Sequence, residues 1–207
     1  LVISHRATIL DHNIQAGWTE GSLAQTADKM LRDIELSAAG SIAKILSTAP
    51  STEVFSEAKP TGKPMEVAED LIDILTAHIN QTVGHELSDF VVLLPVSLVG
   101  VLNRAAQRAG VGDIEDLIGT SVQPYSGTDY GIFLLPKHFT SLSYREGRDG
   151  NVWKIEATRN PGRQAWDLEI MTVVDIVVNG KVKVKLTADG LQTETVAFPM
   201  ITNIKLA

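Results

Sequence analysis

Apolar residues recur every three or four positions from residue 22 to residue 46, which predicts a long amphipathic helix. Ser22 and Gln25 form a capping-box pattern at its start, where their side chains can bond free backbone amides. At about 1.5 Å per residue the helix would be roughly 40 Å long, more than a small domain needs, so we expect a strut. Its apolar stripe consists of Leu23, Ala27, Met30, Leu31, Ile34, Ala38, Ile42, Ile45 and Leu46.

A helix–strand–helix pattern follows over residues 65–110. The first helix has Pro64 before it and Gly84 after it, which are typical start and stop signals. A buried strand is predicted at residues 90–95, and the second helix has Ser97 as its expected cap and Gly110 at its end. The prolines and small polar residues between residues 47 and 64 predict a linker or exposed loop.

Residues 113–119 predict a short helix that ends at a glycine, and an internal echo surrounds it. Residues 89–95 and 129–136 both begin with an acid and an aromatic residue and both end in Leu-Leu-Pro. One echo does not make a repeat protein, so we interpret the two segments as neighbouring strands that leave the same edge of one sheet.

From residue 142 onward the pattern changes to the two-residue period of antiparallel strands. Residues 153–157 alternate, residues 159–163 form a turn, and residues 168–178 form a long apolar strand. Asn179-Gly180 then predicts a hairpin, Asp189-Gly190 a further turn, and residues 195–206 one or two closing strands. In residues 1–20, the short apolar runs predict strands or an extended arm.

Composition allows a sizeable core but gives little sign of chemistry. The chain has 207 residues, 44% of them hydrophobic, and its net charge of −7 argues against a basic nucleic-acid-binding surface. There is no cysteine, which excludes disulfides and thiolate metal sites, and no apolar run is long enough to cross a membrane. We expect a protein that does not span a membrane.

No catalytic, cofactor-binding or metal-binding residue is predicted. His78, His85 and Glu86 could be read as metal ligands, but His85 lies beyond the expected end of its helix. The carboxylates at residues 66–73 suit the first turns of a helix, where acids favour the helix dipole. Phosphate-loop, dinucleotide and nucleophile-elbow patterns are absent.

The residues best suited to contacts between subunits are basic and lie at turns and on one strand. Arginine bonds carboxylates in a bidentate manner and is favoured at interfaces, although the same mixture of charges equally suits a solvated surface. The lysines could contact an acidic partner, but the preferred interpretation is that their charge protects an exposed edge strand from aggregation. The candidates are Arg145, Arg148, Arg159, Arg163, Lys181, Lys183 and Lys185.

In the order of its elements the chain resembles the major capsid protein of tailed bacteriophages, whose Hong Kong 97-type fold is shared with encapsulins. The likeness covers roughly residues 21–190 and implies an α+β fold with a long spine helix, an α/β axial domain and long antiparallel peripheral strands. It assigns residues 1–20 to an N-terminal arm or a remnant of the extended loop. The spine helix and linker then occupy 21–64, the axial domain 65–145 and the return strands 146–207. The start at Leu1, without methionine, fits the maturation cleavage of that family or a chain cut for expression.

The resemblance implies a structural, non-enzymatic subunit of a virion. Identical copies would form hexamers and pentamers of an icosahedral shell around double-stranded DNA. Assembly would take place in the host cytoplasm, with scaffolding, portal or cement proteins as further partners. Three alternatives stay open: an encapsulin-type compartment, a tail or adaptor ring, and an α/β enzyme with a dispersed site such as His78, Asp129 and His138.

Overall fold

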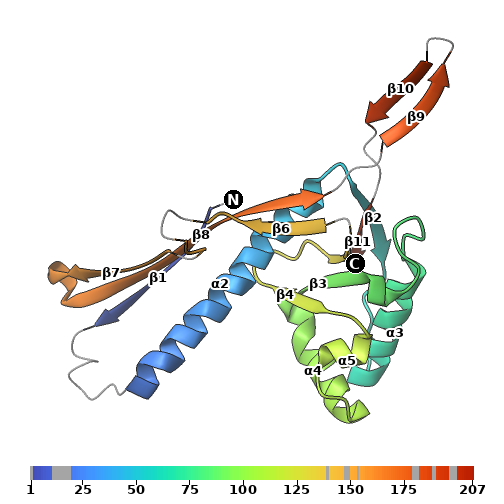
Figure 1. Cartoon of the computed structure of the whole chain (residues 1–207). Helices are drawn as coiled ribbons and strands as arrows, with labels where there is room; N and C mark the ends of the chain where they lie inside the picture. The colour runs from blue at the N-terminus through green and yellow to red at the C-terminus, as the bar shows by residue number, and fades with distance from the viewer. Residues whose placement is uncertain are drawn as a thin grey trace. The chain divides into compact units, whose positions relative to one another are not determined.

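The structure, a computed structural model, describes residues 2–10, 20–138, 140–146, 150–152, 154–178, 182–187, 190–195 and 200–207 (Figure 1). The chain divides into two compact units, residues 1–38 with 142–176 and residues 39–141 with 177–207. Each unit is therefore assembled from two separate stretches of the chain. In chain order the elements are β1 (Val2–Leu10), α2 (Glu20–Thr48), β2 (Thr52–Glu57), α3 (Pro64–Ala77), η1 (Leu87–Asp89), β3 (Phe90–Pro95), α4 (Val96–Ala109), α5 (Ile114–Ile118), β4 (Val122–Tyr125), β5 (Ile132–Pro136), β6 (Thr140–Tyr144), β7 (Lys154–Asn160), η2 (Pro161–Arg163), β8 (Ala165–Val178), β9 (Val182–Thr187), β10 (Gly190–Thr195) and β11 (Ile201–Leu206).

The second unit is built on a five-stranded mixed sheet with the strand order β2-β11-β5-β3-β4. β11 pairs parallel with β2 and antiparallel with β5, and β3 pairs antiparallel with β5 and parallel with β4. Helices α3, α4 and α5 pack against alternate residues of the sheet and form one apolar core. Its buried members are Ala68, Leu71, Leu75, Phe90, Val92, Leu94, Leu98, Leu102, Ala105, Ile114, Ile118, Ile132, Leu134 and Ile204.

Local signals set most of the helix ends in this unit. Gly110 and Gly119 end α4 and α5 in the left-handed conformation, at φ 74° and 81°, as the sequence predicts. Asp113 caps α5, because its carboxylate accepts a hydrogen bond from the Asp116 amide at 2.9 Å. The predicted cap at Ser97 is wrong, since Pro95 occupies the N-cap position of α4.

Helix α3 is shorter than predicted and ends at Ala77 instead of Gly84. Gly84 serves close packing: a Cβ at this position would lie 2.6 Å from the Phe90 ring. The glycine is needed for a tight approach of the loop to the core, which a sequence pattern cannot distinguish from a helix stop.

Two segments that the sequence left outside the core belong to the central sheet. Residues 52–57, predicted to be part of a linker, form the edge strand β2. The closing strand at residues 201–206 lies inside the same sheet, between β2 and β5. The two echo segments form neighbouring strands, as predicted. The strands are antiparallel, with Phe90 opposite Pro136, so they end on opposite sides of the sheet and not on the same side.

The first unit is a four-stranded sheet in which β8 pairs with β1, β6 and β7. β1 runs antiparallel to β8, with Val2 opposite Val173 and Leu10 opposite Ala165, and β7 is also antiparallel to β8. Met30 and Ile34 of α2 pack on Ile170 and Val174 of β8. The arm predicted at residues 1–20 thus contains a paired strand.

The long helix α2 is confirmed, but its start and its apolar stripe differ from the prediction. It begins at Glu20, so Ser22 lies within the helix and does not cap it. Leu31 and Ile45 are exposed, although both belong to the predicted stripe. In the second unit, its buried apolar side chains are Ala39, Ala43 and Leu46, and Gly40 is buried as well.

Strands β9 and β10 form a separate two-stranded hairpin with Thr187 opposite Gly190, as the turn signal at residues 189–190 predicts. Residues 179–181, which include Asn179-Gly180, lie outside the described residues. In the described ranges, the flanking strands β8 and β9 do not pair with each other.

We predict opposite effects for two helical glycines. A Cβ at Gly40 of α2 would overlap the carbonyl oxygen of Ser126, whereas a Cβ at Gly100 of α4 would meet no atom within 4 Å. Gly40→Ala should therefore lower the free energy of unfolding by about 1–3 kcal/mol through overpacking. The matched variant Gly100→Ala should raise it by about 0.5–1 kcal/mol, since alanine favours a helix. Urea unfolding of both variants checks this, and a neutral Gly40→Ala would contradict the close packing of α2.

Candidate assembly surfaces

The end of the β7–β8 hairpin next to the turn η2 carries an exposed pair formed by an arginine and a tryptophan. The Arg159 guanidinium lies 5.6 Å from the centroid of the Trp166 ring, within the range of a cation–π interaction. Trp166 is 40% exposed, and Arg163 in the turn η2 is exposed as well. Tryptophan and arginine are the residues most enriched at the centres of protein interfaces, so this end of the sheet is suited to contact a partner.

Asp167 joins the three strands at this end of the sheet. Its carboxylate accepts hydrogen bonds from the Thr8 hydroxyl at 2.7 Å and from the side-chain amide of Asn160 at 3.1 Å. These bonds, followed by the charges of Arg6 and Arg163, lower the pKa of Asp167 below its usual value. Side-chain hydrogen bonds therefore hold β1, β7 and β8 together at this surface.

A second polar link, between Arg6 and Glu169, ties β1 to β8. The guanidinium and carboxylate are 2.6 Å apart, and this bond raises the pKa of Arg6. Because Arg6 is well exposed, solvent screens the pair, and its main effect is to fix the register of the two strands.

The predicted basic residues of the first unit lie at separate points along β8. Arg145 follows β6, where its amide bonds the Val173 carbonyl at 2.9 Å, whereas Arg159 lies opposite Trp166, seven residues along β8. Lys183 and Lys185 belong to β9, where they lie opposite Glu194 and Gln192 in the ladder. Arg148 and Lys181 fall outside the described residues. Their role as contact residues stays a prediction.

Sequence reasoning missed Trp166 and the exposed apolar residues elsewhere. Val54 on the edge strand β2 is 48% exposed, and Val96 at the start of α4 is 47% exposed. The available signal was weak: Trp166 comes directly after an arginine-containing turn, but only the fold shows that no described element covers it.

Two of the residues considered for chemistry, His78 and Asp129, make contacts that connect elements of the fold. The His78 ring lies 2.7 Å from the Glu57 carboxylate and stacks against Phe55 with centroids 4.4 Å apart, which links the end of α3 to β2. Asp129 accepts a hydrogen bond from the Gly131 amide at 2.9 Å and orders a loop. His138 is exposed, and no hydrogen bond among the described residues joins it to His78 or Asp129.

Two further groups stabilise loops of the second unit. The Tyr125 hydroxyl donates to the Gly131 carbonyl at 2.8 Å and accepts from the Tyr130 amide, and burial raises its pKa to about 12. Asp89 accepts hydrogen bonds from the His85 and Glu86 amides, which lower its pKa.

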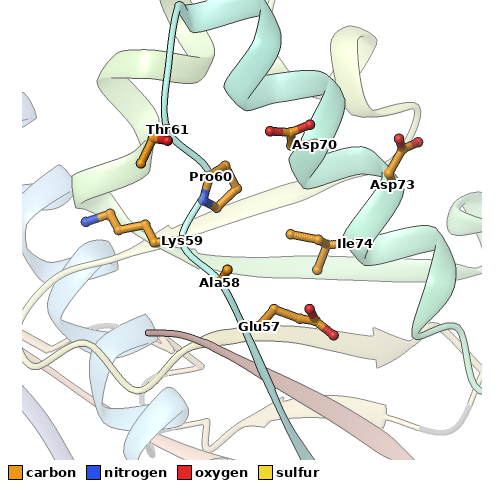
Figure 2. Close-up of a pocket in the computed structure, with 8 residues that line it drawn as sticks. All are labelled: Glu57, Ala58, Lys59, Pro60, Thr61, Asp70, Asp73 and Ile74. Carbon is orange, nitrogen blue, oxygen red and sulfur yellow. The ribbon is translucent and has the colours of Figure 1, made fainter.

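An open pocket lies between α3 and the segment that follows β2, and its lining is mostly polar (Figure 2). Asp70, Asp73 and Glu57 contribute carboxylates and Lys59 an ammonium group. Within the described ranges, no group of three or more metal-ligating side chains is close enough to hold an ion. None of the described helices is long and apolar enough to cross a membrane.

Comparison with known proteins assigns the fold. Neither a protein-family model nor a curated protein sequence matches this chain. A solved structure from Mycobacterium phage Che8 aligns with 99% of this chain and 70% of its own length, at 12% identity and a TM-score of 0.52. The procapsid of satellite phage P4 aligns with 100% of this chain and 76% of its own, at 14% identity and a TM-score of 0.46. The encapsulin SrpI from Synechococcus elongatus aligns with 98% and 73%, at 11% identity and a TM-score of 0.39.

The shared fold rests on the Che8 structure, whose TM-score is the only one of these three above 0.5. At 12% identity this likeness shows the fold alone. It confirms the α+β fold that the order of elements predicts.

The lowered pKa of Asp167 predicts a pH-dependent contribution to stability. A carboxyl with a depressed folded-state pKa stabilises the fold above its unfolded pKa of about 3.9 and loses this effect as the pH falls through the folded-state value. Asp167→Asn should therefore lower the guanidinium unfolding midpoint at pH 7, and the difference from the parent should narrow towards pH 3.

The matched control is Asp28→Asn, which changes an exposed carboxyl on α2 and should leave the midpoint nearly unchanged. An Asp167→Asn effect of equal size at both pH values would show that lost packing, and not the charged carboxylate, accounts for it.

Proposed function

We propose that this chain is the structural subunit of an icosahedral capsid that encloses the double-stranded DNA of a tailed phage. The observation that carries the proposal is the fold, which the Che8 phage structure shares over nearly the whole chain. The described residues also favour a structural role, because their polar clusters bind strands and loops together.

The division of labour between the two units follows from their architecture. The unit with the four-stranded sheet and the first part of α2 would be the peripheral domain, and its long strands would form the wall of the shell. The unit with the five-stranded sheet would be the axial domain and would meet its copies around the symmetry axes of hexamers and pentamers.

The exposed apolar groups support assembly of identical copies. Trp166, Leu31, Ile45 and Val54 would each remain partly in water in a lone subunit. In a closed shell every such contact is repeated in each copy, so contacts that are weak individually add up to a stable particle. Scaffolding, portal or cement proteins would be additional partners, and assembly would take place in the host cytoplasm.

Negative-stain microscopy of the purified protein tests the proposal. We expect closed particles of uniform size, and particles made in phage-infected cells should contain double-stranded DNA. An enzyme cargo in place of DNA would indicate an encapsulin-type compartment, and open rings or tubes would indicate a tail or adaptor protein. A monomer of 22.4 kDa at all concentrations would contradict assembly altogether.

Trp166 should act as an anchor of the shell. Trp166→Ala removes a ring that is 40% exposed and contacts Arg159, so the melting temperature should change little. The protein concentration needed for particle formation, followed by light scattering, should rise by more than about tenfold, as expected for an interface hot spot. Val152→Ala, which truncates another exposed side chain of this unit, is the control and should leave assembly nearly unchanged. If Trp166→Ala assembled normally, this end of the sheet would not be part of the interface.

A further inference from the structure

The β9–β10 hairpin lacks the support that a two-stranded sheet needs. In the described ranges its strands pair only with each other. An isolated hairpin is at best marginally stable in water, and three strands or a packed face are needed for stability. Residues 182–187 contain no proline, so every backbone amide of β9 can donate a hydrogen bond, and its two lysines favour a partner strand that carries acidic residues.

The second unit has an open sheet edge at β2. Among the described strands it pairs only with β11, and its sequence contains no proline, so all of its backbone amides can donate to a further strand. The carbonyls of Ser51 and Glu57 accept bonds from the Met200 and Ala207 amides, each at 2.9 Å. Because successive residues direct their backbone groups to opposite sides, the amides and carbonyls of Val54 and Ser56 point to the outer edge.

The outer edge of β9 has a matching backbone pattern. Thr187 and Gly190 face each other across the turn, and in a four-residue turn these two residues are the hydrogen-bonded pair. Hydrogen-bonded and non-hydrogen-bonded pairs alternate along an antiparallel ladder. The backbone groups of Val182, Val184 and Leu186 therefore point away from β10, toward the free edge.

The two edges are also complementary in side chains. If Val184 is placed opposite Val54 in an antiparallel pair, Lys185 falls opposite Glu53. The Val–Val pair is then the hydrogen-bonded one, and the Lys–Glu pair occupies a non-hydrogen-bonded position, where opposite side chains are closest. β2 carries two glutamates and no basic residue, while β9 carries two lysines and no acid.

We infer that β9 of one copy adds to the β2 edge of a second copy and extends its five-stranded sheet by the two strands of the hairpin. This inference rests on the proposed function, because a surface donated to one neighbour and received from another closes only in a ring of copies.

The occupant is a second copy because pairing within one copy would require the linking chain to be almost fully extended and to pass through the sheet. In that arrangement Thr195 would lie level with Ser56, while Ile201 lies opposite Thr52. The distance from Thr195 to Ile201 would be about 13 Å along the strands and about 14 Å across three strand spacings, or about 20 Å in a straight line. Six residue steps reach at most about 20–22 Å when fully extended, and a straight path would pass through β9 and β2.

Disulfide trapping tests the inference directly, since the chain has no cysteine of its own. Val54→Cys and Val184→Cys would place two thiols on Cα atoms about 5.5 Å apart, within the range of a disulfide. Under mild oxidation the double variant should form a ladder of dimers and larger species on a non-reducing gel. A mixture of the two single variants should form dimers only.

The control pairs Val54→Cys with Val96→Cys, an exposed residue away from the proposed contact, and should give no ladder. Particles that form but remain uncrosslinked would overturn the inference and leave the proposed function standing. An internal disulfide in single chains would overturn it in favour of pairing within one copy. If the parent protein forms no particles by microscopy, the proposed function itself fails and the inference with it.

A charge exchange provides an independent readout. Glu53→Lys should reduce the crosslinked fraction of the double-cysteine variant several-fold, because it places a lysine opposite Lys185. Adding Lys185→Glu should restore the fraction. Failure of this second change to rescue crosslinking would contradict the proposed register.

Discussion

The second unit depends on the backbone hydrogen bonds of its last strand. β11 lies between β2 and β5 and bonds to both, so without it the central sheet would be two fragments with open edges. Thr202, Asn203 and Ile204 are fully or almost fully buried, which shows how closely both faces of the sheet are covered at this position. Because the strands of the other unit lie between β2 and β11 in the chain, this sheet joins segments that are far apart in sequence, which is expected to slow its folding.

Because each unit joins two separate stretches of the chain, only the elements with local signals can be predicted from the sequence. Helices α4 and α5 and the strand β3 follow from local signals, namely apolar periodicity, prolines and the glycines Gly110 and Gly119. β2 was mistaken for a linker because its partner lies more than a hundred residues away in the chain and its exposed edge leaves it without an apolar pattern. The early end of α3 has a similar cause, since Gly84 is required by the Phe90 ring and not by a helix terminus.

The candidate surface was less predictable than the fold. Charged residues at turns suggested a contact region, but the structure separates Arg145 from Arg159 along β8. Trp166 and Val54 gave no periodic signal, because exposure depends on which elements cover a residue in three dimensions. The open edges of β2 and β9 likewise become visible only when the strand order is known.

Exposed aromatic and apolar groups, an open sheet edge and an unsupported hairpin are all unfavourable in a lone soluble chain. They are explained together if the subunit works among identical copies. Cryo-electron microscopy of the purified particles tests this account most directly. We expect a closed icosahedral shell in which this fold is repeated around five-fold and six-fold positions. A stable single subunit, or an open ring or tube of any size, would contradict it.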